Sequence, residues 1–184
     1  WLHVEAETGV FEPRSRVVAV KGGGDWPYSF LKLEARGYIA PGKRHVLAAR
    51  FIGQLSADPL PLQLQPWIGG AHTLRSRATD YLTGDNGYLA QAEWRVDAPG
   101  GVFFGPFVDV ARTWYTHGWT ASAAETAIGV TLGVALPPEA FEGAPTAPEL
   151  LRVDVAYPVT RGGPFGATDK KKTPRLWVRV DLPY

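Results

Sequence analysis

Carboxylates near arginines are the residues of this sequence whose types and spacing come closest to a chemical site. Glu93 and Asp109 lie in neighbouring stretches of alternating residues, and two such carboxylates can serve as the acid and base of a glycosidase. Arginines surround them in the sequence, so an ion network between guanidinium and carboxylate groups accounts for both carboxylates better. We therefore predict no catalytic residues and expect that the chain is not an enzyme.

The residues that could bind a metal or a cofactor do not have the spacing of known sites of these kinds. The chain has no cysteine, and its four histidines are scattered without the spacing of metal ligands. Asp80, Asp85 and Asn86 lack the remaining ligands and the closing glutamate of a calcium loop. The sequence contains no nucleophile elbow, phosphate loop or dinucleotide fingerprint. We expect no metal and no cofactor.

The composition favours one all-β domain over residues 1–184. The chain is long enough for one sizeable core, and 21 glycines, 16 prolines and 12% aromatic residues indicate many turns and few helices. The net charge of +1 gives no reason to expect a nucleic-acid partner. No apolar run is long enough for a membrane helix, but membrane-barrel strands carry a much weaker signal.

Alternating apolar and polar residues predict about eight antiparallel strands. The expected strands comprise residues 2–8, 28–37, 44–55, 88–96, 102–111, 127–136, 151–157 and 176–184. The first connection runs to residue 27, although residues 16–20 can extend a strand into it. Residues 39–43 form a short link, residues 56–86 the longest loop, and residues 113–124 a loop rich in aromatic residues. Long and short connections roughly alternate, as they do in outer-membrane barrels.

The direction of the apolar face separates two architectures that share this alternation. In a soluble barrel the apolar face points inward, whereas in a membrane barrel it meets lipid and the polar face lines the lumen. Unbroken rows of Leu and Val, aromatic residues near strand ends, and both charge signs within stretches such as Lys32-Glu34-Arg36 favour lipid. We therefore predict an antiparallel transmembrane β-barrel.

A series of short motifs runs from Ile68 to Ala111. It contains a Gly-Gly pair, a Leu-Arg dipeptide, a Glu-x-Arg strand and a Phe-x-Asp strand, and the chain ends on an aromatic residue. The residues concerned are Gly69, Gly70, Leu74, Arg75, Glu93, Arg95, Phe107, Asp109, Leu182 and Tyr184. These motifs resemble the barrels of the BamA/TpsB superfamily (the bacterial surface antigen family), in which the loop motif reads Val/Leu-Arg-Gly-Phe/Tyr.

Three positions depart from the family's pattern. Ser76 and Arg77 stand where the loop motif has glycine and an aromatic residue, and Ala111 stands where the aspartate motif ends in glycine. The resemblance implies that the arginine of the loop motif enters the lumen and meets the strand aspartate. The expected docking partners of the loop are Glu93, Arg95 and Asp109.

The extent of the resemblance bears on how the barrel closes. The chain matches only the C-terminal half of the family's barrel, without its upstream strands or POTRA domains. Eight strands that close alone leave an interior filled by side chains, so a folded-in loop requires a wider barrel. Further strands, or a second copy paired through edge strands, would complete it.

The resemblance implies an outer-membrane barrel that inserts or secretes other polypeptides. Its partners would be the lipid bilayer and unfolded or nascent polypeptides, and its location the bacterial outer membrane. An alternative is a passive outer-membrane anchor for an N-terminal domain such as a lipase. A third is a soluble lipocalin-like ligand binder, although the first strand lacks the Gly-x-Trp signature of that class.

Overall fold

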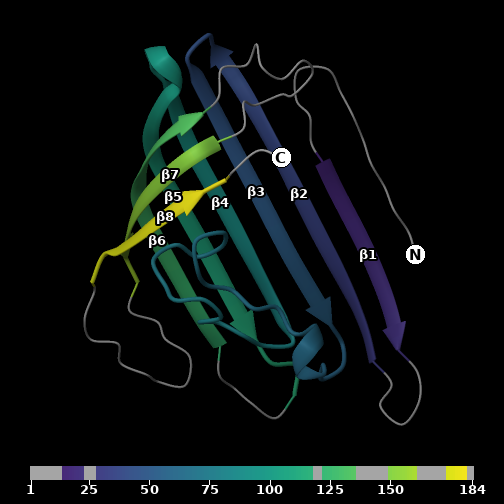
Figure 1. Ribbon diagram of the computed structural model, residues 1–184. Coiled ribbons are helices and arrows are strands. Elements are labelled where there is room, and N and C mark those ends of the chain that lie inside the picture. Colours follow the sequence, from purple (N-terminus) through teal and green to yellow (C-terminus); the bar gives the residue numbers. More distant parts are fainter. Residues whose placement is uncertain (1–13, 23–27, 118–121, 136–148, 161–172, 182–184) are drawn as a thin grey trace.

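A single antiparallel sheet of eight strands dominates the computed structural model (Figure 1). The structure describes residues 14–22, 28–117, 122–135, 149–160 and 173–181, and only the backbone of residues 14–22. Each strand pairs with its neighbours in the sequence, from β1 to β8 in order. The strands are β1 (Arg14–Gly22), β2 (Tyr28–Gly42), β3 (His45–Ser56), β4 (Asn86–Asp97), β5 (Val102–Trp114), β6 (Ser122–Ala135), β7 (Glu149–Pro158) and β8 (Arg175–Val180).

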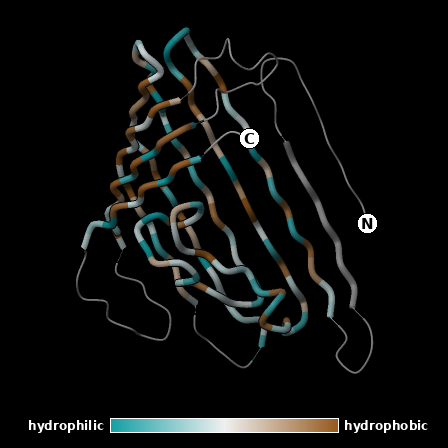
Figure 2. The backbone as a smooth tube through the Cα atoms, viewed as in Figure 1, coloured by the Kyte–Doolittle hydropathy of each residue, from teal (hydrophilic) through white to brown (hydrophobic). Residues whose placement is uncertain are grey.

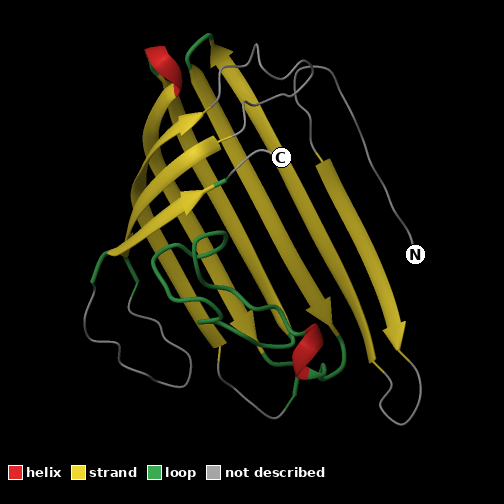
Figure 3. Ribbon diagram, in the orientation of Figure 1, coloured by secondary structure: helices red, strands yellow, loops and turns green. Residues whose placement is uncertain are grey.

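Helical structure is confined to two single turns in the described part of the chain (Figure 3). The 3-10 turn η1 (Leu62–Leu64) lies in the long loop after β3, and η2 (Pro99–Gly101) joins β4 to β5. No helix among the described residues is long and apolar enough to cross a membrane. The predicted all-β class with antiparallel strands is confirmed.

Several predicted boundaries are wrong. The strand predicted at 2–8 lies outside the described residues, and β1 occupies the region predicted as a connection. The predicted link at 39–43 belongs largely to β2, because Ile39 still pairs with Leu47 before the register shifts at the Pro41-Gly42 turn. The predicted loop at 113–124 is shorter, because Thr113 and Ala123 pair across β5 and β6. Apolar alternation underestimates strands whose ends pair through small or polar residues.

The two faces of the sheet differ in chemistry, and hydropathy alternates along strands β2–β8 (Figure 2). Residues paired directly across antiparallel strands share a face, so the register joins the apolar residues of successive strands into continuous rows. One row runs through Pro106, Val130 and Val155. These apolar residues are exposed, with 57% of Val130 and 42% of Val155 accessible. The opposite face carries the buried charged residues, so the usual arrangement of a water-soluble protein is reversed.

The sheet is not closed into a barrel. Strands β1 and β8 are its two edges, and no pairing joins them within the described residues. The sequence left open whether eight strands close into a barrel on their own. The described residues do not form such a closed barrel. The sheet curls, and the loop between β3 and β4 lies on its polar side, opposite β8 (Figure 1).

Candidate functional site

A glycine pair shapes the loop of residues 57–85 between β3 and β4. Ile68 and Leu82 exchange backbone hydrogen bonds of 2.9 and 2.8 Å, which close an inner loop. At its entrance Gly69 and Gly70 have φ values of +151° and +98°. A Cβ atom on Gly69 would lie only 2.1 Å from the carbonyl oxygen of Ala78. Glycine is therefore required at this position for both conformation and space.

A small apolar cluster seats the loop on the sheet. Leu74, the residue before the loop arginine, is fully buried. It belongs to a cluster in which residues of the loop pack against β4, β5 and β6. The members are Ile68, Leu74, Leu82, Leu89, Ala111, Ala123 and Ala127. Ala111 is fully buried within this cluster.

Arg75 is held by Asp109 through three hydrogen bonds. Its Nε and Nη2 atoms donate to the two carboxylate oxygens at 2.9 and 2.7 Å, and its backbone N–H donates to Oδ2 at 3.1 Å. Only 4% of Arg75 and none of Asp109 is exposed. The paired donors match the planar fork of the guanidinium, and burial strengthens the attraction. The contact expected between these residues is present in the structure.

Four more residues, from four different strands, surround Arg75. Its Nη1 atom donates to Glu93 Oε2 on β4 at 3.0 Å and lies 3.6 Å from Asp154 Oδ1 on β7. Its guanidinium stacks on the Phe107 ring of β5, with 3.3 Å between Cζ and the ring centroid. The Trp177 indole of β8 donates to the Arg75 carbonyl at 2.6 Å. The loop therefore lies between β5 and β8, inside the curl of the sheet.

Further arginines extend this ion network along the sheet. Arg152 on β7 donates to Glu93 and binds Asp154 at 3.0 Å. Arg179 on β8 reaches Asp154 at 3.5 Å. Glu93 and Asp154 therefore each contact at least two basic residues, which offsets the cost of burying their charges.

A second arginine, Arg77, forms an ion pair that the sequence analysis missed. Arg77 Nη2 donates to both oxygens of the fully buried Glu125 on β6, at 3.0 Å each, and its guanidinium lies over the Tyr81 ring. A signal existed in the sequence, because Glu125 is the only charged residue of β6. Arg77 therefore has a strand partner of its own.

Two polar residues fasten the base of the loop. Asp85 accepts hydrogen bonds from the backbone N–H groups of Leu60 and Thr116, at 2.8 and 2.9 Å. Asn86 accepts from the Ser56 N–H at 2.7 Å. Partial burial, together with the negative charge of Asp85, raises the pKa of the Tyr115 phenol. Asp85 and Asn86 thus anchor backbone rather than forming a cation site.

Small residues on β6 make room for the rings beneath the arginines. A Cβ atom on Gly129 would lie 2.3 Å from the Phe107 ring, which supports Arg75. The same distance separates such an atom on Gly133 from the Phe103 ring, on which Arg95 stacks. These two residues of β6 are therefore small because larger side chains would collide with the Phe107 and Phe103 rings. The alternation of residues alone does not reveal this.

The other predicted site residues are placed differently. Arg95 does not contact the loop among the described residues; it binds Asp97 at 2.5 Å and lies 3.6 Å from Glu149. The prediction that Arg95 docks the loop is therefore wrong, because its position on β4 lies nearer the opposite end of the strand. Leu182 and Tyr184, the predicted C-terminal strand signal, lie outside the described residues.

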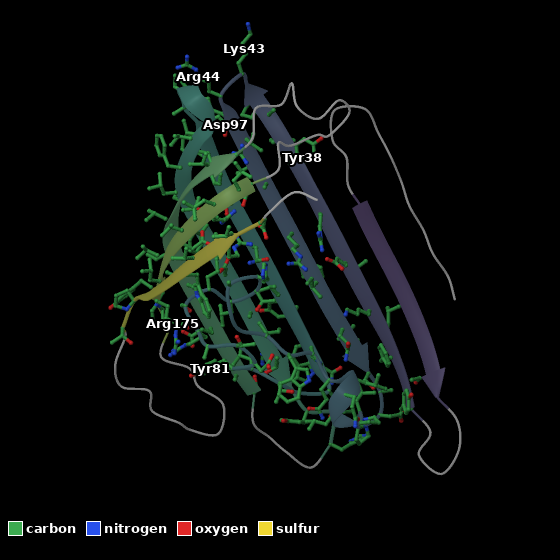
Figure 4. All side chains as sticks on the ribbon, in the orientation of Figure 1. Tyr38, Lys43, Arg44, Tyr81, Asp97 and Arg175 are labelled. Atoms are coloured by element: carbon green, nitrogen blue, oxygen red, sulfur yellow. The ribbon has the colours of Figure 1, made fainter. Side chains whose placement is uncertain are left out.

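Figure 4 shows the side chains of this region, with Tyr81 of the loop and Asp97 near opposite ends of the sheet.

Within the described ranges, no group of three or more histidine and acidic residues is arranged to hold a metal ion. The sequence was also compared with protein-family models and with curated proteins, and neither comparison finds a match. The arrangement is one of ion pairs that hold a loop on a sheet.

Proposed function

We propose that this chain is part of the wall of a bacterial outer-membrane barrel that inserts or secretes other polypeptides. The observation that carries the proposal is the reversed sheet: rows of exposed Leu and Val on one face and buried ion pairs on the other. Monomeric soluble proteins rarely expose continuous apolar surfaces of this kind, whereas barrel strands present such a face to lipid. A soluble lipocalin-like barrel would have the opposite arrangement.

The docked loop supports a barrel wider than eight strands. The interior of an eight-stranded barrel is filled by its own side chains, so it has no space for a folded loop. Here the loop occupies the polar side of an open sheet whose edges, β1 and β8, are not paired with each other in the described residues. Additional strands, or a second copy of the chain, would continue the wall.

The arginine loop favours polypeptide handling over passive anchoring. A passive anchor needs only an apolar surface that contacts lipid. This chain also buries two loop arginines against carboxylates on the polar face of the sheet. That arrangement is similar to the lumen loop of the BamA/TpsB superfamily. The proposed role requires no cofactor and no covalent chemistry, because it consists of lowering the barrier to strand insertion.

Partitioning tests the membrane part of the proposal. The full-length protein should enter the detergent phase in a phase-separation assay and float with liposomes. If it stays soluble in water as a monomer without detergent, a membrane barrel is wrong and the soluble alternative gains support.

An insertion assay separates the translocating role from the anchor. Liposomes that contain the protein should speed the folding of an unfolded outer-membrane protein, relative to empty liposomes. Arg75→Ala should reduce this acceleration, whereas Arg112→Ala should not, because Arg112 is an exposed residue in the row of Val110 and Val108 on the other face. No acceleration by the unaltered protein would favour the passive anchor.

A further inference from the structure

The polar face of the sheet divides into two parts that differ in charge. Over β4–β8, its six acidic residues are Glu93, Asp97, Asp109, Glu125, Glu149 and Asp154. Its four basic residues there are Arg95, Arg152, Arg175 and Arg179. These strands alone therefore carry an acidic surplus of two.

The loop supplies the missing positive charge. Arg75 and Arg77 are the only basic residues of the loop that reach the buried carboxylates, binding Asp109, Glu93 and Glu125. The remaining acids are paired with strand arginines. When Arg75 and Arg77 are added to the strand residues, six basic side chains match the six acidic ones of this part of the face; the loop's three aspartates are not in this count.

The polar face of β1–β3 has the opposite imbalance. It carries Lys32, Arg36 and Arg50, whereas Glu34 is the only acidic residue in the three strands. Glu34 already binds both Arg36, at 2.6 Å, and Arg50, at 3.1 Å.

Two basic residues of this part, Lys32 and Arg36, are exposed. The side chain of Arg36 is 59% exposed, and Lys32 is exposed with no ion pair among the described residues. On β3 the loop contacts Arg50, which donates to the His72 carbonyl, and Gln54, which donates to the Leu64 carbonyl. On β2 the loop contacts Ser29, at the start of the strand, which donates to Asp58 at 3.1 Å. In the view of Figure 1 the loop lies over the lower part of the sheet and leaves most of β1 and β2 clear.

We propose that the polar face of β1–β3 binds an acidic, extended segment of polypeptide. Just as two loop arginines bind the carboxylates of the acidic part of this face, charge complementarity favours an acidic partner on the basic part. Lys32 and Arg36 lie on the same face of β2, four residues apart with Glu34 between them, and acidic side chains four residues apart on an extended peptide have the same spacing. This inference rests on the proposed function, since the segment would belong to the polypeptide that the barrel handles.

Peptide binding tests this inference directly. The probe is a fluorescent ten-residue peptide of alternating Glu and Ser, added to the full-length protein in detergent micelles at low salt. Anisotropy should show binding that weakens as salt increases. A matched peptide with Gln in place of Glu should bind at least about tenfold more weakly, because it lacks the charge.

Charge-reversal variants locate the site. The double variant Lys32→Glu/Arg36→Glu should weaken binding of the Glu peptide by about tenfold or more. The matched control is Lys43→Glu/Arg44→Glu, which makes the same change of charge at the turn between β2 and β3, at the end of the sheet (Figure 4). This control should leave the dissociation constant nearly unchanged.

Four outcomes would overturn the inference. They are equal binding of the Glu and Gln peptides, equal losses in both double variants, displacement of the peptide by equimolar inorganic phosphate, and binding only after Glu5, Glu7 and Glu12 are replaced by Gln. Phosphate displacement would indicate a site for small anions, and the last outcome would indicate that the chain's own acidic residues occupy the face. Because the binding is measured in detergent, its failure is distinct from failure of the liposome assays that test the proposed function.

Discussion

Arg77 of the loop and Glu125 of β6 form a buried ion pair in which one guanidinium nitrogen donates to both carboxylate oxygens at 3.0 Å. Arg77 is 4% exposed and Glu125 is fully buried. Together with Arg75 and Asp109, this pair ties the loop to two adjacent strands. Two separate ion pairs hold the loop in position, because the second pair prevents the loop from pivoting about the first.

Asp109→Ala should release the loop from β5. The substitution leaves a buried guanidinium with fewer acceptors, and breaking a buried ion pair of this kind costs about 3–5 kcal/mol. We expect faster proteolysis between Ser56 and Asn86 and a lower free energy of unfolding. Asp80→Asn is the matched control, because Asp80 is an exposed loop residue with φ +58° that asparagine tolerates. Unchanged proteolysis of the Asp109 variant would show that the ion pair does not hold the loop.

The Arg77–Glu125 pair should behave as a coupled unit. Either Arg77→Met or Glu125→Leu alone breaks this buried ion pair and should destabilise the protein by about 3–5 kcal/mol. The double variant should be closer to the unaltered protein than either single variant, because both charges are then removed. A double-mutant cycle in urea measures this coupling. Strictly additive losses would contradict a direct interaction.

Gly69→Ala should prevent the loop from closing. The new methyl group would meet the Ala78 carbonyl oxygen at 2.1 Å, in addition to the strain of φ +151°. Gly100→Ala is the matched control, because Gly100 also has a positive φ, +78°, but no atom within 4 Å of the added methyl. The control should cost only about 1 kcal/mol of backbone strain. Similar protease sensitivity of both variants would mean that the Gly69 contact is not essential.

Val130→Arg tests which medium covers the apolar face. Val130 is 57% exposed in the middle of β6, where a membrane barrel meets the hydrocarbon. Folding into liposomes should be weakened by about 2–4 kcal/mol, the cost of an arginine at the bilayer midplane. In contrast, a water-exposed position would tolerate the change within about 0.5 kcal/mol. Urea titration of liposome-folded protein distinguishes these results.

Local pattern predicted the fold class and most of the strands, but not their ends. Alternation located β3 and β7 within a residue or two, because a period of two depends only on neighbouring side chains. It missed β1 as a full strand and ended β2 too early, at Gly37 rather than Gly42. Ends paired through glycine, proline and small residues carry no apolar signal, and only the partner strand defines them.

The candidate site was predicted in part, for a related reason. The resemblance of motifs predicts a contact of Arg75 with Glu93 and Asp109, whereas it marks Arg77 only as a departure from the motif. Its partner Glu125 lies 48 residues away, and nothing local links the two. The same limit explains why Arg95 was assigned to the loop although it binds Asp97, two residues along its own strand.

The sequence by itself determined that this chain forms antiparallel strands with one apolar and one charged face, because alternation is a local property. Only the tertiary structure decided that the apolar face points outward, that the sheet stays open within the described residues, and that two loop arginines neutralise buried carboxylates. Those features depend on register and on the curl of the sheet, which bring together residues far apart in the chain. Burial of opposite charges at such sites is a property of the assembled fold, and strand periodicity carries no information about it.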